Sequence, residues 1–171
     1  NKFTLKLTGN QKKVMKESVF YAFTTAINLL TEEGKKIFYD NYPNGIHIHT
    51  PEAATPKDGP SAGVAFTLGF LSLMLNLKVD KELALTGEVD LLGNATKIGG
   101  VKYKVQGGFK AGVKKIFLPS SNKEDVDKTK KELPEIFDNE HECFFMDHAL
   151  DVAKVALIDF DSKKHLLKNY N

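Results

Sequence analysis

The sequence predicts one α/β domain over residues 1–171, with a mixed sheet and flanking helices. Three observations carry this prediction. Segments typical of strands alternate along the chain with segments typical of helices. The 171 residues suit a single domain, and 42% hydrophobic with 27% charged residues is enough apolar mass for a core. No internal repeat or low-complexity segment interrupts the alternation.

The elements follow in order along the chain. The strand-like segments are residues 3–9, 45–51, 82–89, 95–98, 114–119 and 141–147. The helix-like segments are about 11–31, 61–76, about 101–112, a segment that ends near 132, and a segment that ends near 158. Asn10 is expected to cap the first of these, Gly99-Gly100 precede the third, and Asp147 is expected to cap the last. Ser121 and Glu124 match the capping-box pattern that would open the helix ending near 132. Residues from about 161 to 171 are predicted to form a loose tail.

Charge and cysteine content exclude several classes of protein. Lys and Arg total 24 against 22 for Asp and Glu, so a net charge of +2 gives no case for nucleic acid or a membrane as partner. Cys143 stands alone in an apolar strand, which indicates an inert core thiol and a reducing compartment. The longest apolar run, Val64 to Leu77, is too short and interrupted to span a bilayer, and no signal peptide is visible. Residues 1–10 already resemble a strand in mid-fold, which suggests a piece of a longer protein.

The stretch TPKDGPSAG (55–63) raises the possibility of a nucleophilic serine, because it contains the pattern G-x-S-x-G. Gly59 permits a sharp turn, and Pro60 suits the first turn of a helix. Ser61 then lies at the start of a buried helix, where free N–H groups would stabilise an oxyanion. The alternative is structural: Ser61 as a simple helix cap and Gly63 as a site of close packing.

Two residues are candidates for the base that would activate Ser61. His148, beside Asp147, would fit an α/β-hydrolase, but a loop separates the serine motif from the preceding strand. In VKYKVQGGFKAG (101–112), helical spacing places Lys104 at the edge of the apolar face and Lys102 on the polar face. A buried neutral lysine can accept a proton from a serine. The alternative is that the stem of Lys104 packs while its ammonium reaches solvent.

The segments HIHTPEAATPKDGPSAG, LALTGEV and IGGVKYKVQGGFKAGVKKIFLPSSNKED together closely resemble the proteolytic domain of Lon proteases. The resemblance runs in order from about GNQKKVMKES to FFMDHALDVA, which is most of the chain. It implies a serine–lysine peptidase with Ser61 as nucleophile and Lys104 as base. It also implies that Thr86 holds the lysine amine, that Gly59, Pro60 and Ala62 support the nucleophile, and that Asp58 either caps the turn or pairs with Lys104.

The resemblance also implies partners outside this domain. Lon proteases carry an upstream ATPase module, which uses ATP and Mg²⁺, and this chain contains no G-x-x-x-x-G-K-[ST]. The resemblance also implies that the chain begins after the first strands of the proteolytic domain. No cofactor is therefore expected here. The implied substrates are unfolded polypeptides, the implied assembly is a hexameric ring, and the implied compartment is the mitochondrial matrix or the bacterial cytoplasm. The alternative is a Lon-like domain kept only as the scaffold of a ring ATPase.

Five further residues depart from the family pattern or lack a clear role. Lys97 replaces the usual Pro before IGG, and Tyr103 replaces the usual Glu between the two lysines, which would alter the groove or a subunit contact. His47 and His49 share one face of a strand, but with no obvious third ligand we expect no metal site. Glu88 is either structural or close to the substrate groove.

Overall fold

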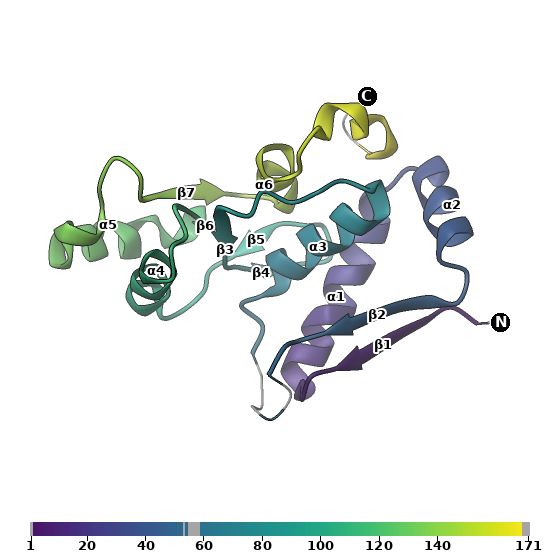
Figure 1. The fold of residues 1–171 in the computed structure, drawn as a ribbon, viewed down its shortest axis with the longest axis horizontal. Coiled ribbons are helices and arrows are strands. Elements are labelled where there is room, and N and C mark those ends of the chain that lie inside the picture. The colour runs from purple at the N-terminus through teal and green to yellow at the C-terminus, as the bar shows by residue number, and fades with distance from the viewer. Residues whose placement is uncertain (1, 53, 55–58, 169–171) are drawn as a thin grey trace.

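The computed structural model describes residues 2–52, 54 and 59–168 (Figure 1). The helices are α1 (Lys13–Leu29), α2 (Glu32–Asn41), α3 (Gly63–Leu75), α4 (Val101–Lys110), α5 (Lys123–Glu132) and α6 (Ala149–Ala156). The strands are β1 (Thr4–Thr8), β2 (Gly45–His49), β3 (Leu83–Leu85), β4 (Glu88–Val89), β5 (Ala95–Thr96), β6 (Lys115–Pro119) and β7 (Glu142–Met146). Four 3₁₀ turns cover Ser120–Asn122, Pro134–Ile136, Phe160–Ser162 and Lys164–Leu166.

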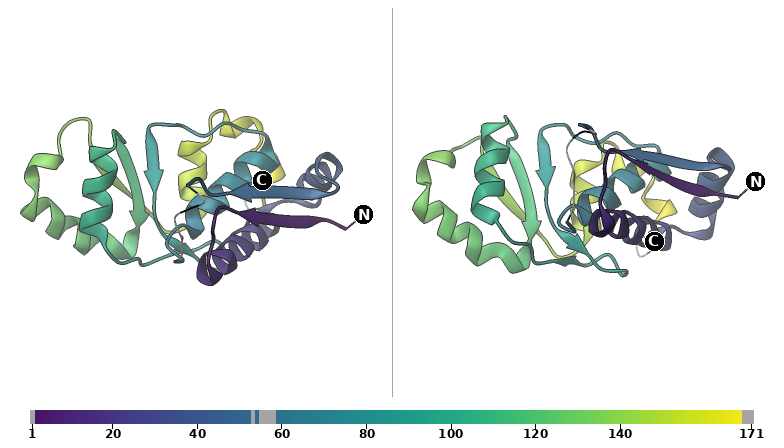
Figure 2. Two further views of the ribbon diagram at one scale, coloured as in Figure 1. Left: turned by 60° about the horizontal axis from the view of Figure 1, so that its bottom comes forward. Right: turned by 90° about the horizontal axis from the view of Figure 1, so that it is seen from below.

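A three-stranded parallel sheet in the order β3-β6-β7 separates two apolar cores. Phe117 stacks on Phe144 of the neighbouring strand and faces the core that α3 and α6 share. Ile116 and Leu118 point to the opposite face, where they pack with buried residues of α4 and α5. Helices therefore cover both faces of the sheet, as both views in Figure 2 show. This arrangement explains the continuous apolar sequence of β6.

Two smaller sheets complete the α/β fold. β1 and β2 pair in parallel with Thr4 opposite Gly45, and one face of this ribbon packs on α1, α2 and α3. The ring of Phe3 in this ribbon stacks on Phe23 of α1. β4 and β5 form an antiparallel hairpin, so the predicted mixture of strand directions is confirmed. None of the helices in the described part of the chain is long and apolar enough to cross a membrane.

The first helical region differs from the prediction. The chain breaks after Leu30 and starts a second helix, α2, which the sequence analysis missed. The signal was present: Thr31 caps α2 by accepting from the N–H of Gly34, and two glutamates follow in the first turn. Asn10 is not a cap, because its φ of 60° is left-handed and α1 begins only at Lys13, after Lys12.

Other boundaries also differ from the prediction. The predicted strand 82–89 breaks at Thr86 and Gly87, so that β3 and β4 belong to different sheets. A 3₁₀ turn replaces the predicted capping box of Ser121 and Glu124, and no side chain caps α5. His148, with Asp151 at the third helical position, caps α6 in place of Asp147.

The C-terminal segment is packed rather than loose through Lys168. Two 3₁₀ turns carry it back over the body of the domain, where Leu166 and Leu167 are buried. The N–H of Lys168 donates to the carbonyl of Leu29 at 2.8 Å, which ties the segment to the end of α1. Burial of two leucines offsets the cost of ordering this polar stretch.

Candidate functional site

Ser61 lies in a tight turn immediately before α3, at the edge of the central sheet where β3 ends. Gly59 has a φ of +114°, a left-handed conformation that favours glycine, as the sequence predicted for a sharp turn. The N–H of Gly63 donates to the carbonyl of Pro60 at 3.1 Å and closes the turn. Ala62 is the N-cap position of α3, so Ser61 precedes the helix by two residues.

The main chain of Ser61 is hydrogen-bonded to the segment that follows β3. The carbonyl of Ser61 accepts hydrogen bonds from the N–H of Gly87 at 2.8 Å and from the hydroxyl of Thr86 at 3.2 Å. The N–H of Val64 returns a bond to the carbonyl of Gly87 at 3.0 Å. These three hydrogen bonds fix the position of the Ser61 main chain, and with it the Cα atom that bears the side chain. The sequence analysis missed Gly87, although a glycine inside a strand pattern is a signal for close backbone approach.

Two amides at this turn can serve an oxyanion. Within the described residues, the N–H groups of Ser61 and Ala62 have no hydrogen-bond acceptor, whereas those of Gly63 and Val64 are already used. Donors near a serine Oγ are what a tetrahedral intermediate requires. The N–H groups that the sequence predicted as oxyanion donors at the helix start are therefore those of Ser61 and Ala62, in the turn before α3.

Thr86 has a different partner from the one that the resemblance implied. Its hydroxyl hydrogen goes to the carbonyl of Ser61 and not to a group on α4. In the part of the chain that the structure describes, the ammonium of Lys104 makes no hydrogen bond or ion pair, with Thr86 or with Ser61. A hydroxyl oxygen retains lone pairs when it donates, so Thr86 can still accept from an amine.

The predicted orientation of the two lysines on α4 is wrong. Lys104 is exposed, and Lys102 is the half-buried one. The buried stripe of α4 consists of Val101, Val105 and Phe109, and the helix ends before Gly112. At about 100° per residue, the middle of that stripe lies about 60° from Lys102 and about 100° from Lys104. The prediction erred because it included Gly112 and omitted Phe109. Any role of Lys104 therefore rests on its place in the family motif.

Lys102 is engaged in a structural ion pair. Its ammonium lies 2.9 Å from a carboxylate oxygen of Glu132 at the end of α5. The hydrogen bond that Lys102 donates to the Glu132 carboxylate, followed by the negative charge of that group, raises the pKa of Lys102 above the usual value. The same hydrogen bond lowers the pKa of Glu132. Both shifts favour the charged pair, so Lys102 is poorly suited to act as a base.

Both ring nitrogens of His148 are engaged in structural hydrogen bonds. Its Nδ1 accepts from the N–H of Leu150 at 3.0 Å, and its Nε2 lies 2.8 Å from the carbonyl of Leu92. This pattern assigns the proton to Nε2. Protonation of Nδ1 would break the cap of α6, so the geometry argues against His148 as a base for Ser61. Asp58, the remaining candidate, lies outside the described residues.

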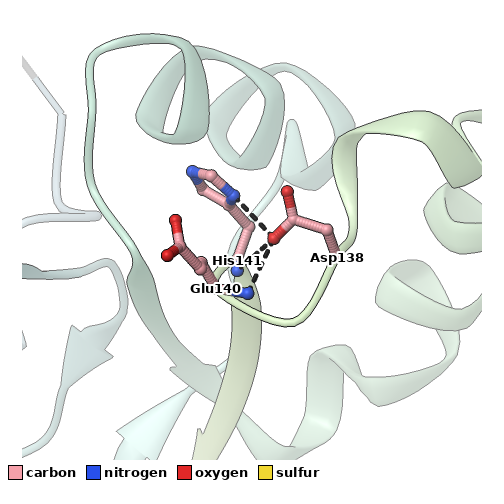
Figure 3. A network of polar contacts seen from close by, with 3 residues as sticks. All are labelled: Asp138, Glu140 and His141. Atoms are coloured by element: carbon pink, nitrogen blue, oxygen red, sulfur yellow. Dashed lines mark hydrogen bonds and ion pairs between the residues drawn. The ribbon is translucent and has the colours of Figure 1, made fainter.

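Three other histidines, His47, His49 and His141, have local partners. The hydroxyl of Thr8 lies 2.6 Å from Nε2 of His47 and 2.9 Å from Nδ1 of His49, and joins the two rings across β1 and β2. Figure 3 shows a second cluster, in which one oxygen of Asp138 accepts from the N–H groups of Glu140 and His141 and contacts the His141 ring. The backbone bonds and the His141 hydrogen bond lower the pKa of Asp138. Among the described residues no three His, Cys, Asp or Glu side chains gather as metal ligands.

Comparison with known proteins identifies the family. A model of the Lon protease (S16) C-terminal proteolytic domain matches residues 1–159. The chain belongs to the Lon protease family. It is 45% identical over 159 residues to a Lon protease homolog of Acanthamoeba polyphaga mimivirus, which covers 92% of this chain and 15% of the relative. It is 42% identical over 160 residues to a mitochondrial Lon protease homolog of Phaeodactylum tricornutum, covering 93% of this chain and 18% of the relative.

A bacterial relative extends the comparison. The Lon proteolytic domain described here is 37% identical over 158 residues to the Lon protease of Fervidobacterium nodosum, covering 92% of this chain and 19% of that protein. The chain thus spans less than a fifth of the length of each of these three relatives. Both blocks that carried the resemblance, around Ser61 and around Lys104, lie inside the matched residues.

Proposed function

We propose that this Lon proteolytic domain is a serine endopeptidase that hydrolyses peptide bonds of unfolded polypeptides, with Ser61 as nucleophile and Lys104 as base. The observation that carries the proposal is the family match over residues 1–159, which includes both motif blocks. The geometry at Ser61 supports it. The Ser61 carbonyl is fastened to Thr86 and Gly87, and two neighbouring amides are without an acceptor among the described residues.

In the proposed reaction the neutral amine of Lys104 removes the proton of the Ser61 hydroxyl while Oγ attacks the substrate carbonyl carbon. The developing oxyanion accepts hydrogen bonds from the free amides of the turn. The lysine ammonium then protonates the departing amine, and water hydrolyses the acyl-serine ester. Because Lys104 is exposed and makes no polar contact with Ser61, the dyad forms only when this flexible side chain turns toward the serine.

The wider setting is part of the same proposal. We expect an ATPase module that uses ATP and Mg²⁺ to feed substrate, and a homo-oligomeric ring, hexameric in the full-length protein, to enclose the site. No cofactor, metal, nucleic acid or membrane is assigned to this domain. Relatives occur both as mitochondrial proteins and in bacteria, so the proposed compartment is the mitochondrial matrix or, alternatively, the bacterial cytoplasm.

The proposal is tested by peptide cleavage with variants of the natural full-length protein. Ser61→Ala and Lys104→Met should each lower the rate by at least about 10²- to 10⁴-fold, because each removes a group that acts in the transition state. Lys104→Arg should fail as well, since a guanidinium keeps its proton. Lys102→Met is the matched control and should leave the rate almost unchanged.

Other outcomes assign the domain differently. If Lys102→Met is inactive and Lys104→Met is active, the assignment of the base is wrong. If His148→Ala alone abolishes cleavage while its folding is normal by circular dichroism, the hydrolase alternative holds. If the wild type cleaves nothing but still assembles with its ATPase module, the domain is a scaffold.

A further inference from the structure

A hollow of about 240 Å³ is lined in part by Pro60, the residue that precedes Ser61. One wall is α1, which contributes Val14, Glu17, Ser18 and Tyr21, and the other consists of Pro60, Glu88 and Val89. Pro60 directly precedes Ser61, and Glu88 directly follows Gly87, whose N–H holds the Ser61 carbonyl. The hollow is therefore lined by a direct sequence neighbour of Ser61 and by a direct sequence neighbour of Gly87, the residue that binds the Ser61 carbonyl. We call it the Glu17–Glu88 hollow.

The walls of the hollow combine apolar surface with two carboxylates. Val14 is 41% and Tyr21 is 51% exposed, so both offer apolar surface to a ligand. Glu17 lies on the same face of α1, because it follows Val14 by three residues and precedes Tyr21 by four. Within the described residues, neither Glu17 nor Glu88 forms an ion pair, so two carboxylates line the hollow without a paired cation.

Neighbouring lysines do not neutralise the hollow. Lys13 and Lys16 line an adjacent depression, to which Phe20 and Glu17 itself also contribute, and neither lysine forms an ion pair with Glu17. The side chain that suits the hollow therefore has a long apolar stem and a positive end. The stem would pack against Val14 and Tyr21, and the positive end would lie between the two carboxylates.

We propose that the Glu17–Glu88 hollow binds a lysine or arginine side chain of the substrate polypeptide, at one fixed position relative to the scissile bond. This inference rests on the proposed peptidase function. A purely apolar side chain would desolvate two carboxylates without giving them a partner. An acidic side chain would be repelled by both. The hollow would thus select substrates by charge as well as by shape.

The experiment measures kcat/KM for sets of peptides that differ at a single position, scanned across both sides of the scissile bond. Each set carries lysine, norleucine or glutamate at that position, because norleucine keeps the stem of lysine and removes only its charge. At one position the wild type should prefer lysine over norleucine by about tenfold and reject glutamate. The preference should weaken as salt is added.

Three variants connect the preference to the hollow. Glu17→Gln and Glu88→Gln should each lower the lysine-to-norleucine ratio about threefold, and the double variant should bring it close to one. Cleavage of the norleucine peptide should remain, since neither glutamate takes part in the proposed chemistry. Glu33→Gln, an exposed glutamate on α2 with no ion pair among the described residues, is the control and should not change the ratio.

The outcomes separate this inference from the function on which it rests. If the wild type cleaves peptides but shows no preference for lysine, or the double variant keeps the preference, the hollow does not bind a basic side chain and only this inference fails. If no peptide is cleaved, or Ser61→Ala cleaves as fast as the wild type, the peptidase proposal fails and the inference fails with it.

Discussion

At the residue scale, Gly59 and Pro60 set the turn before α3, whereas the direction of Lys104 depends on how α4 packs. Gly59 and Pro60 place Ser61 before α3 because a left-handed glycine and a fixed proline φ are properties of those residues themselves. The direction of Lys104 depends on which residues α4 buries against α5, and that stripe includes Phe109. Because Phe109 was left out of the buried face, the predicted direction of that face was shifted toward Lys104.

Thr86 is expected to position the nucleophile through the Ser61 carbonyl. Thr86→Val keeps the shape of the side chain and removes the donor, so Ser61 would retain only the bond from Gly87. We expect kcat to fall about 3- to 10-fold with little change in KM, since the attacking atom is less well placed. Thr86→Ser should restore the rate. A variant with normal kcat, or a loss that appears only in the melting temperature, would contradict this role.

Cys143 is expected to be inert in the folded protein. Burial raises the pKa of its thiol to about 11, against an ordinary value near 9. Alkylation by iodoacetamide at pH 8 should therefore be roughly 100-fold slower in the native protein than in urea, since thiolate is the reactive form. Because the folded pKa is raised, the stability from this group is complete below about pH 9 and is lost as the pH rises toward 11. Equal alkylation rates in both states would show that the thiol is accessible.

At the element scale, the sequence was most informative where the signal is local. The strict alternation around His47 and the apolar run of β6 were placed within one or two residues of their observed positions. The break at Thr86–Gly87 was missed, because tertiary hydrogen bonds to Ser61 and Phe117 decide where β3 ends. The start of α5 was misread for a related reason. Asn122 has no partner that can be recognised from sequence, yet its side chain binds the main chain of Ile98, which lies 24 residues earlier, before α4 and β6.

Asn122 should contribute strongly to stability by binding both main-chain polar groups of Ile98, in the segment that leads into α4. Its amide accepts from the N–H of Ile98 at 3.0 Å and donates to the carbonyl of Ile98 at 2.8 Å, and the side chain is fully buried. Asn122→Ala leaves both backbone groups unpaired, which should cost about 2–4 kcal/mol in the free energy of unfolding measured in urea. Ser121→Ala is the control. This control should change the free energy of unfolding by less than about 0.5 kcal/mol, because Ser121 is exposed and no side chain caps α5.

At the scale of the whole molecule, topology brings the site together at one edge of the sheet. β3, β6 and β7 run in parallel, so their carboxyl ends lie on the same side. Ser61 is fastened there through Thr86 and Gly87, and the β4–β5 hairpin is tied to the end of β7 by the bond from Ala95 to the carbonyl of Asp147. This is the edge at which α/β sheets usually bind ligands. The sequence order of strands and helices predicted the class of fold, whereas this convergence requires the three-dimensional pairing.

Self-association of the domain should be weak, concentration-dependent and head-to-tail. A ring needs two different surfaces on each subunit. The structure exposes Leu91 and Leu92 on the β4–β5 hairpin, and Val155 and Ile158 near the end of α6. Contact between these two pairs would bury apolar surface that a monomer leaves in water. Sedimentation velocity should therefore show a weight-average coefficient that rises with concentration.

A mixing experiment tests the head-to-tail arrangement. A variant with serine at 91 and 92, and a second with serine at 155 and 158, should each remain monomeric. Each keeps one intact surface, so a mixture of the two should associate about as strongly as the wild type, but only as pairs, because neither partner can extend the contact further. Association of either variant alone would place the contact elsewhere. A wild type that stays monomeric at every concentration, even in its natural full-length form, would contradict ring assembly itself.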